Sequence, residues 1–436
     1  MRSFTLYSNG LRTASGRFVP DVREAELKLV KLYPDYRDQT WEGFGVAVTD
    51  SSGSVFAKMD EAHRKELIDA FFSEEGMNYS VVRVPVDSCD FSVETYEAAP
   101  DGDLSRFDTS RSLKYILPML EAIREKKEIA LLLCPWSPPA AFKSNGIRQK
   151  GGKCLPAYWD DWAAILCRYV KELRDRGFRV LGITLQNEPH ASQTWDSCLW
   201  TAEEERDFMI RSVRPALDRA GFRDVGIYIW DHNKERVLDR SLVELAGEGR
   251  DCAAGVAFHW YTGDHFDALR EVHRLFPDKK LMLSEHCLGQ TIRSEGADAG
   301  RGRIAHELVG DLESGMNICF DWNILLDEQG GPNYVDNFCH APYLYDTKAA
   351  VLARQQIYDA YWHFAHFLRP GDVRILSSSF SSELEATAFL RESGEIVLIL
   401  HNRGAAGPVS VVLGDTIASF ELPAASVNTL VIGPES

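Results

Sequence analysis

The sequence contains no hydrophobic run long enough to cross a membrane. Apolar stretches such as EIALLLC, which begins at residue 128, are far shorter than the about 20 residues that a spanning helix requires. The first residues, MRSFTLYSNGLRTASGRF, also lack the basic segment, apolar stretch and cleavage site of a secretory signal. We therefore expect no membrane insertion and a cytoplasmic location, although a secreted protein trimmed of its leader would begin in the same way.

Paired cysteines are lacking as well. The nine cysteines are an odd number, spread from Cys89 to Cys339, and no two of them form a Cys-x-x-Cys pair. This pattern disfavours a disulfide framework and a zinc ribbon, and it indicates reduced thiols. No His-x-x-x-His spacing is present either. The sequence therefore predicts no metal site and no cofactor.

Positive charge is scarce relative to negative charge. The 436 residues include 48 Lys and Arg against 65 Asp and Glu, which leaves a formal net charge of −17. Such a charge repels phosphate backbones and anionic lipid, so we expect no nucleic-acid partner, and neutral ligands stay open. Hydrophobic residues make up 45% and charged residues 26% of the chain, a balance typical of a soluble globular protein with a large core. The length favours two domains.

Short β-branched or aromatic runs alternate with longer helical patterns over most of the chain. The helical patterns include a stretch from Val55 to Ser73, and Thr201 with Glu204 forms a capping-box pattern that opens another helix. The strand runs are apolar nearly throughout, as in a barrel that helices cover outside and side chains fill inside. Eight such units predict an α/β fold, a (β/α)8 TIM barrel. The runs are WEGFGVAV (from 41), SVVRVPV (80), EIALLLC (128), VLGITLQ (180), VGIYIW (225), AAGVAFHW (253), KLMLSE (280) and MNICFDW (316).

Past Pro370 the pattern changes to short strands with no helix between them. VRILSSSF, EATAFLR, EIVLILHN and VSVVL are separated by Gly, Ser or Asn turns, which is typical of an antiparallel sandwich. The first 37 residues also contain strand patterns, SFTLYS and ELKLVKL, but no barrel unit. We therefore predict a barrel over residues 38–367 and a side β-sandwich domain built from both chain termini, residues 1–37 and 368–436.

Glu188 and Glu285 each end a predicted buried strand. Glu188 follows LGITLQN and precedes Pro189, which turns the chain outward, and Glu285 ends LMLSE. In a (β/α)8 barrel the carboxyl ends of the strands form the active-site face, where strands four and seven lie opposite each other. A single glutamate at a strand end is commonly a solvated loop residue. Two of them across a sugar-sized mouth are the pair that glycoside hydrolysis requires.

Polar and aromatic side chains suited to a neutral sugar stand at other strand ends. Aromatic faces cover the C–H patches of a sugar, and charged or amide groups bond its hydroxyls. Taken singly, the tryptophans are explained equally well by core packing, and His259 by an ordinary buried histidine. The residues are Arg83, Asp90, Trp136, His259, Tyr261, Trp322 and Asn323.

At these residues the chain resembles glycoside hydrolase family 30, the glucocerebrosidase-like retaining β-glycosidases. The resemblance covers most of residues 41 to 340 in order and implies a (β/α)8 barrel with a side β-sandwich. The matching stretches are GFGVAVTD, FFSEEGMNYSVVRVPVDSCDFS, CPWSPPAAFKSNG, LQNEP, FHWY, HRLFP, SEHC and DWNILLDEQGGPNY.

The resemblance also implies roles for single residues. Glu188 would be the general acid/base and Glu285 the nucleophile. Asn187 would bond the sugar 2-hydroxyl, and Arg83 would hold the carboxylate of Glu285. His259 and Tyr261 would support the two glutamates from behind. The innermost glucosyl unit would be bound by Asp90, Trp136, Trp322 and Asn333.

The sequence thus predicts a retaining hydrolase of β-glucosidic bonds that acts on a small glycoside or oligosaccharide. We expect a poorly solvated site and the charge of Glu285 to raise the pKa of Glu188, so that it keeps its proton. Three alternatives stay open: β-xylosidase or β-fucosidase activity, a sugar-binding barrel without turnover, and a metal-dependent barrel enzyme, for which the strand-end histidines His259 and His286 are few. The sequence carries no signal of oligomeric state.

Overall fold

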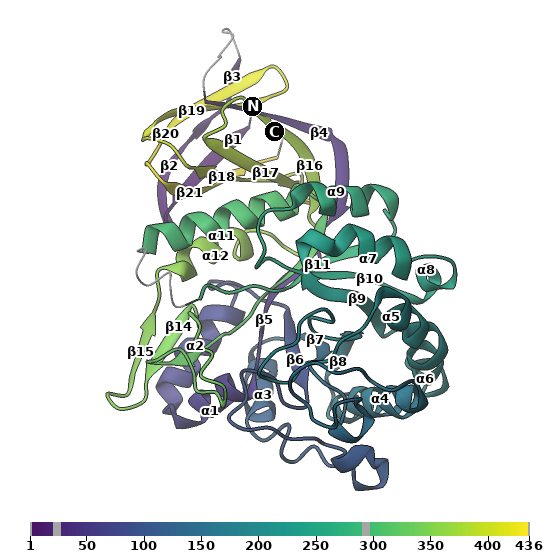
Figure 1. Cartoon of the computed structure of the whole chain (residues 1–436). Helices are drawn as coiled ribbons and strands as arrows, with labels where there is room; N and C mark the ends of the chain where they lie inside the picture. Colours follow the sequence, from purple (N-terminus) through teal and green to yellow (C-terminus); the bar gives the residue numbers. More distant parts are fainter. Residues whose placement is uncertain (1, 21–27, 290–296, 435–436) are drawn as a thin grey trace.

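The computed structural model describes residues 2–20, 28–289 and 297–434 (Figure 1). Eight strands close into a barrel, and every adjacent pair in it is parallel. Each strand overlaps one of the eight predicted runs, so the predicted TIM-type barrel is confirmed. The strands are β5 (Gly43–Ala47), β6 (Val81–Val86), β7 (Ala130–Pro135), β8 (Arg179–Thr184), β9 (Gly226–Asn233), β10 (Gly255–His259), β11 (Lys280–Glu285) and β12 (Met316–Asp321).

Helices surround the barrel strands (Figure 1). In α4 the buried side chains of Trp162, Leu166, Tyr169 and Leu173 recur at helical spacing and form the face that packs inward. Gly177, with a φ of 86°, stands just past the end of this helix, where a left-handed residue closes the last turn. The helices are α1 (Asp50–Lys58), α2 (Glu61–Phe72), α3 (Ile116–Lys126), α4 (Trp159–Asp175), α5 (Ala202–Phe208), α6 (Arg214–Arg219), α7 (Val237–Glu244), α8 (Glu248–Cys252), α9 (Phe266–Leu275), α11 (Ala297–Leu312) and α12 (Ile357–Ala365).

The predicted helix from Val55 to Ser73 is two helices. Helix α1 ends at Lys58, and α2 begins after Asp60, whose carboxylate accepts a hydrogen bond of 2.9 Å from the backbone N–H of His63. An aspartate at this position caps a new helix more readily than it continues an old one. The capping box predicted for Thr201 and Glu204 is present at the start of α5.

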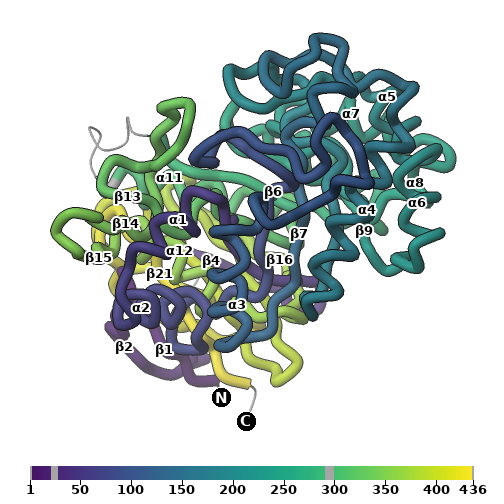
Figure 2. The backbone as a smooth tube through the Cα atoms, turned by 90° about the horizontal axis from the view of Figure 1, so that it is seen from below, coloured from purple at the N-terminus to yellow at the C-terminus, as the bar shows by residue number. Residues whose placement is uncertain are grey.

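Strands from both ends of the chain share one ten-stranded sheet. Strand β1 lies between β2 and β21, and β4 pairs with both β16 and β19; Figure 2 shows the two termini close together. The sheet folds over itself, because Phe4 of β1 packs against Phe420 of β20 with ring centroids 5.6 Å apart. This confirms the predicted side domain from both chain termini, while its boundaries at residues 37 and 368 stay a prediction. The strands are β1 (Ser3–Ser8), β2 (Leu11–Arg17), β3 (Val19–Pro20), β4 (Leu29–Thr40), β16 (Val373–Ser379), β17 (Leu384–Leu390), β18 (Ile396–Asn402), β19 (Gly407–Leu413), β20 (Thr416–Leu422) and β21 (Ser426–Ile432).

The sequence does not predict a small sheet that follows β12. Its strands, two to four residues long, are too short to show a periodicity. Single helical turns and one π-helical segment complete the described elements. These elements are β13 (Leu326–Asp327), β14 (Tyr343–Asp346), β15 (Val351–Arg354), η1 (Pro100–Gly102), η2 (Leu104–Arg106), η3 (Ala140–Phe142), η4 (Pro156–Tyr158), η5 (Met209–Val213) and η6 (Lys234–Arg236).

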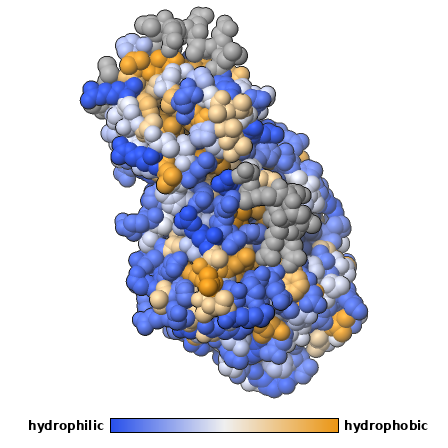
Figure 3. All heavy atoms as spheres, turned by 90° about the vertical axis from the view of Figure 1, so that its left-hand side faces the viewer, coloured by the Kyte–Doolittle hydropathy of each residue, from blue (hydrophilic) through white to orange (hydrophobic). Residues whose placement is uncertain are grey.

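The surface seen in Figure 3 is mostly hydrophilic, with hydrophobic side chains in small separate groups. Within the described residues, no helix has both the length and the apolar character that crossing a bilayer requires.

Arg374 joins the side domain to the barrel. It lies on β16, is 4% exposed, and donates to Gln39 Oε1 and to Glu313 Oε2, both at 3.0 Å. It also pairs with Asp38. Glu313 directly follows α11, the helix that packs against both β12 and strands of the ten-stranded sheet. The buried guanidinium is therefore stabilised by partners from the two parts of the chain that it connects.

Replacing Arg374 with Met should lower the free energy of unfolding by about 3 kcal/mol, because Asp38 and Glu313 would keep their charges beside an apolar side chain. Urea unfolding at neutral pH measures the loss. The matched control is Arg403→Met, just past the end of β18, where the exposed arginine pairs with Glu385 at 3.0 Å and the loss should stay below about 1 kcal/mol. Equal losses in the two variants would contradict a structural role for Arg374.

Candidate active site

A pocket of about 420 Å³ opens at the carboxyl ends of the barrel strands, and both predicted catalytic glutamates line it. A larger cavity, about 520 Å³, lies between α1, α2 and α3 and contains none of the predicted site residues. Because active sites of this fold form at the strand ends, we assign the site to the first pocket. Its lining residues are Asp90, Trp136, Asn187, Glu188, Gln193, Trp195, His232, Asn233, Tyr261, Glu285, Cys287, Gly289, Arg303, Trp322, Asn337 and Cys339.

Glu285, the last residue of β11, is held through both carboxylate oxygens. Arg83 of β6 donates to Oε2 at 2.5 Å, and the hydroxyl of Tyr261 donates to Oε1 at 2.9 Å. Glu285 is only 7% exposed. The two donors fix the orientation of the carboxylate. Arg83 and Tyr261 thus both contact Glu285, in line with the supporting positions that the family resemblance implies for them.

Arg83 is fully buried and connects several sides of the site. Its Nη2 donates to Asn187 Oδ1 at 2.8 Å and lies 3.1 Å from Asp231 Oδ2. The guanidinium carbon also lies 4.8 Å and 5.2 Å from the ring centroids of Trp136 and Trp322. A planar, permanently charged fork with five donors suits this set of contacts, since it can bond carboxylates along its edge and stack on rings with its face.

Glu188 has a left-handed backbone conformation, with a φ of 48°, which is uncommon for a residue other than glycine. Neighbouring strands hold it there: its N–H donates to the carbonyl of Asp231 at 2.9 Å, and the N–H of Asn187 donates to the carbonyl of Pro135 at 2.7 Å. Pro189 follows and cannot continue the ladder. The strained turn directs the carboxylate of Glu188 into the pocket.

A bulge in β9 brings two consecutive side chains to the site. Ala257 of β10 pairs with Trp230, and Phe258 pairs with His232, so Asp231 is the extra residue. Trp230 and Asp231 both have positive φ, 72° and 53°. The bulge interrupts the alternation of side chains along the strand. Asp231 consequently packs behind the pocket while His232 lines it.

Asp231 is fully buried and accepts hydrogen bonds from several sides. Its donors include Cys134 at 2.9 Å and Ser284, and it forms an ion pair with Arg83. Burial alone would raise the pKa of Asp231, but the charge of Arg83 and the hydrogen bonds from His259 and Cys134 hold that pKa well below its usual range. Asp231 is therefore a permanent anion directly behind the pocket.

His259 lies between two carboxylates. Its Nε2 is 3.1 Å from Asp231 Oδ1, and its Nδ1 is 3.3 Å from Glu188 Oε1. Burial disfavours the imidazolium, but the charge of Glu285 and the hydrogen bonds to Asp231 and Glu188 raise the pKa of His259 to about 9. His259 therefore carries a proton at neutral pH.

This imidazolium reverses the prediction for Glu188. Burial favours the neutral carboxyl, but the hydrogen bond from His259 and the charge of its imidazolium lower the pKa of Glu188 below its usual value. The predicted rise in the pKa of Glu188 is wrong. That prediction considers burial and the charge of Glu285 but not the hydrogen bond from His259. In the site without a ligand, the proton on His259 Nδ1 therefore lies in the hydrogen bond that His259 and Glu188 share.

Asp90, Trp136 and Trp322 line the pocket as predicted. The two indole rings stack on each other, with centroids 5.2 Å apart and planes inclined by 25°. Burial and the charges of Glu285 and Glu188 raise the pKa of Asp90 well above its usual range. Its Oδ1 has no hydrogen-bond partner in the described part of the chain. A hydroxyl of a ligand can occupy that position.

The structure corrects the prediction for Asn333. Its side chain is used within its own loop, where Nδ2 donates to the carbonyl of Asn337 at 2.6 Å and Oδ1 accepts from the N–H of Asn337 at 3.0 Å. Asn337 lines the pocket instead, and its amide donates to Asp90 Oδ2 at 3.0 Å. The amide that faces a ligand here is therefore that of Asn337.

Several site residues are missing from the sequence-based prediction. Asp231, His232 and Asn233 directly follow the run VGIYIW, and the signal that identified Glu188, polar residues after a buried strand, would have found them. The others come from loops or from α11 and show no periodic pattern. They are Gln193, Trp195, Cys287, Arg303, Asn337 and Cys339.

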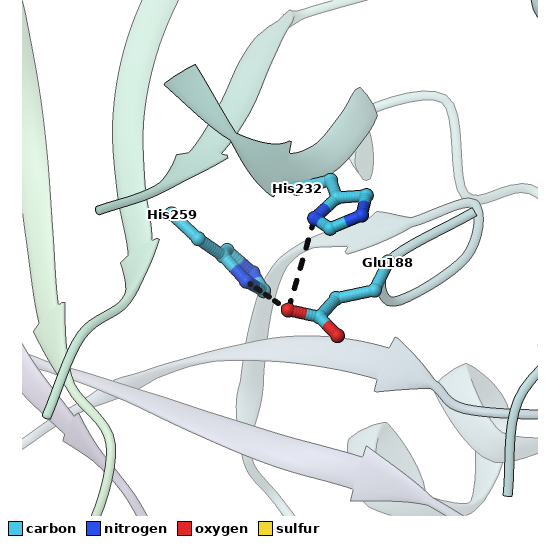
Figure 4. A group of neighbouring side chains, drawn as sticks. All are labelled: Glu188, His232 and His259. Atoms are coloured by element: carbon cyan, nitrogen blue, oxygen red, sulfur yellow. Dashed lines mark hydrogen bonds and ion pairs between the residues drawn. The ribbon is translucent and has the colours of Figure 1, made fainter. Parts of the chain in front are cut away.

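Three of the residues described above have the composition of a metal site. Atoms of Glu188, His232 and His259 that could bind a metal all lie within 4.8 Å of one another (Figure 4). Sequence spacing did not predict this group, because its members come from the ends of three strands. Burial lowers the pKa of His232 to about 4, so that imidazole is neutral at neutral pH.

Comparison with known proteins covers both parts of the chain. Residues 41–368 match the family described as "Glycosyl hydrolase family 30 TIM-barrel domain", and residues 371–430 match its "beta sandwich domain". The chain is 31% identical over 399 residues to the lysosomal acid glucosylceramidase of Mus musculus. The aligned region covers 86% of this chain and 77% of that protein. It is 26% identical over 393 residues to an endo-1,6-β-D-glucanase of Neurospora crassa (85% and 80%). The solved structure of SrfJ from Salmonella typhimurium matches with a TM-score of 0.96 and 34% identity over 99% of this chain and 100% of that one.

Replacing Asp231 with Asn should move the pKa of His259 down from about 9, since the imidazolium would lose a charged hydrogen-bond acceptor. Histidine side-chain NMR during a pH titration measures the shift. His306 serves as an internal control, because Glu385 and Asp264 raise its pKa to about 9 as well and the substitution does not touch them.

The same variant should lose part of the pH dependence of stability. In the wild type, protonated His259 stabilises the fold fully below a pH of about 6.5, and this contribution, on the order of 3 kcal/mol, is lost as the pH rises through about 9. The free energy of unfolding of Asp231→Asn should fall less between these pH values. An unchanged titration of His259 would contradict the role given to Asp231.

Proposed function

Since the chain belongs to glycosyl hydrolase family 30 and is a glycoside hydrolase, we propose that Glu285 and Glu188 hydrolyse a β-glucosidic bond with retention of configuration. The observation that supports this most is that both carboxylates line one pocket with different partners. Arg83 and Tyr261 hold Glu285, whereas His259 contacts Glu188. Different environments assign different tasks to two like groups.

The reaction proceeds in two displacements. Glu285, positioned by Arg83, attacks the anomeric carbon and forms a covalent glycosyl-enzyme. Glu188 gives its proton to the glycosidic oxygen, which leaves with the aglycone. Glu188 then takes a proton from a water molecule that attacks the same carbon, so the sugar is released with its original β configuration and Glu285 is restored.

His259 positions and stabilises the proton that Glu188 transfers. The proton shared by the pair is available to the leaving oxygen through Glu188, which lines the pocket, whereas His259 lies behind it. When Glu188 takes a proton from the attacking water in the second displacement, the pair regains its shared proton. Asp231 keeps the ring of His259 in this orientation through the contact at Nε2.

The innermost subsite takes a glucosyl unit in this proposal. Trp136 and Trp322 offer the aromatic surface, and Asp90, Asn187 and Asn337 offer polar groups for the sugar hydroxyls. β-Xylosidase and β-fucosidase activities are the alternatives, because they need the same two glutamates and differ only in the sugar that the subsite accepts.

For the aglycone we propose a soluble glycoside or oligosaccharide, with the enzyme acting in the cytoplasm. The net charge of −17, which disfavours anionic membrane surfaces, and the similarity to an endo-1,6-β-D-glucanase support it. Glucosylceramide is the second candidate, because relatives with up to 31% identity are named glucosylceramidases.

Replacing Glu285 with Gln should lower kcat by a factor on the order of 10⁵, since the amide cannot form the glycosyl-enzyme. Hydrolysis of an aryl β-glucoside measures the loss. A 2-fluoro-glucoside that traps the intermediate should attach to Glu285 and be located there by peptide mass spectrometry. Near-normal turnover by this variant would contradict the assignment of Glu285 as the nucleophile.

Alanine variants of the two glutamates form a matched pair in the presence of azide. Glu285→Ala should yield the α-glucosyl azide, because azide then attacks in place of the missing nucleophile, and Glu188→Ala should yield the β-glucosyl azide after normal formation of the glycosyl-enzyme. The same azide anomer from both variants would contradict the assignment of roles.

A panel of substrates tests the sugar and the aglycone. Among aryl β-glycosides, we expect the glucoside to give a kcat/KM at least about tenfold above the xyloside, fucoside and galactoside, because a group that loses its hydroxyl partner costs about 1.4 kcal/mol or more. β-1,6-linked glucose disaccharides should then be cleaved faster than glucosylceramide in vesicles. Faster cleavage of the lipid would select the second candidate.

A further inference from the structure

We propose that the active-site pocket binds a Zn²⁺ ion through Glu188, His232 and His259 and that the bound ion switches the enzyme off. The candidate ligand atoms of the three residues lie within 4.8 Å of one another. Figure 4 shows both imidazole rings directed at the same carboxylate oxygen. Two histidines and one glutamate form a ligand set that Zn²⁺ accepts in proteins, with a water molecule as the fourth ligand.

Among the described residues, the His232 nitrogen that faces this group has no hydrogen-bond partner. This nitrogen, Nδ1, is buried, and it lies 3.7 Å from Glu188 Oε1. The residue is 8% exposed, and its ring packs against Trp230 with centroids 5.0 Å apart. A buried polar atom without a partner is unusual in a native protein and calls for an explanation. A cation held jointly with Glu188 satisfies this nitrogen.

His259 is already oriented as a metal ligand. Its Nε2 contacts Asp231 Oδ1 at 3.1 Å, and its Nδ1 faces Glu188 at 3.3 Å. Histidines that bind metals usually donate their second ring N–H to a carboxylate, which fixes the ring and makes the ligand nitrogen more basic. Asp231 is placed to do this for His259. Binding of the ion displaces the proton that His259 shares with Glu188.

Access and charge favour a cation at this position. Glu188 and His232 line the pocket, as does the carboxyl group of Glu285, and the whole chain is strongly acidic. The two imidazole nitrogens select Zn²⁺ or Cu²⁺ over Mg²⁺ and Ca²⁺, which prefer sets of oxygen ligands.

The effect on turnover rests on the proposed function, because the ion occupies the oxygen through which Glu188 would transfer its proton. General acid–base catalysis contributes about 10²–10⁴-fold, so saturating Zn²⁺ should lower kcat/KM at least about 100-fold. EDTA should restore the activity. Mg²⁺ at the same concentration should leave it unchanged.

The binding itself is tested without substrate, by isothermal titration calorimetry of the metal-free protein with ZnCl₂. The wild type should bind one Zn²⁺ at the pocket. His232→Phe removes one ligand but keeps a ring against Trp230. Loss of a residue that only supports a ligand weakens metal binding about 10–100-fold, so loss of the ligand itself should weaken Zn²⁺ binding at least as much. The matched control is His63→Phe, which keeps a ring near Tyr345, 5.7 Å away between centroids, and should bind as the wild type does.

Zn²⁺ affinity that is equal in His232→Phe and the wild type would overturn the proposal, as would a wild type that shows no binding. The thiols of Cys287 and Cys339 line the same pocket with Sγ atoms 3.5 Å apart and are the competing ligands. Zinc-edge X-ray absorption of the loaded wild type separates the two cases without any variant. Our ligand set requires only Zn–N and Zn–O distances of about 2.0–2.2 Å, whereas thiolates would add distances of about 2.3 Å. Because neither measurement uses substrate, the zinc site can stand or fail independently of the catalytic role of Glu188.

Discussion

The buried contacts of Arg83 with Glu285 and Asp231 are the interaction on which the rest of the active site depends. All three groups have left bulk water, and a guanidinium in such a place is stable only while carboxylates and amide oxygens surround it. Arg83 comes from β6, Asp231 from β9 and Glu285 from β11, so this one charge fixes side chains from three sides of the barrel. The orientation of Asn187 follows from the same guanidinium, and that of His259 follows from Asp231.

Irregular backbone delivers the groups that this network positions. Glu188 occupies a left-handed turn, and the bulge in β9 gives Trp230 and Asp231 positive φ. Such conformations cost free energy and persist only where the surrounding structure determines them. Here the N–H of Glu188 bonds to the carbonyl of Asp231, so the two irregular segments stabilise each other. The regular barrel supports the strain, and the strain places a carboxylate and a histidine where a regular strand could not.

Much of the fold and part of the site can be predicted from residue patterns. Eight apolar runs separated by helical patterns predict the barrel, and the residues at the ends of those runs predict Glu188, Glu285 and Trp136. Arg83 lies inside β6 and not at its end, and its place beside Glu285 is predicted only by the family resemblance. Asn333 shows the limit of this reasoning. Asn333 and Asn337 lie in one loop, and only the folded loop shows that the first bonds its own backbone while the second faces the pocket. A loop has no periodicity from which the direction of a side chain could be read.

The sequence by itself determined the class of fold and the two carboxylates at the strand ends, because burial of apolar runs and the direction of parallel strands are local properties that repeat along the chain. Only the tertiary structure decided the protonation of the site and the grouping of Glu188, His232 and His259. These depend on distances of a few ångströms between residues far apart in the chain. Electrostatic interactions follow such distances and the local exclusion of water, and neither quantity is written in residue spacing.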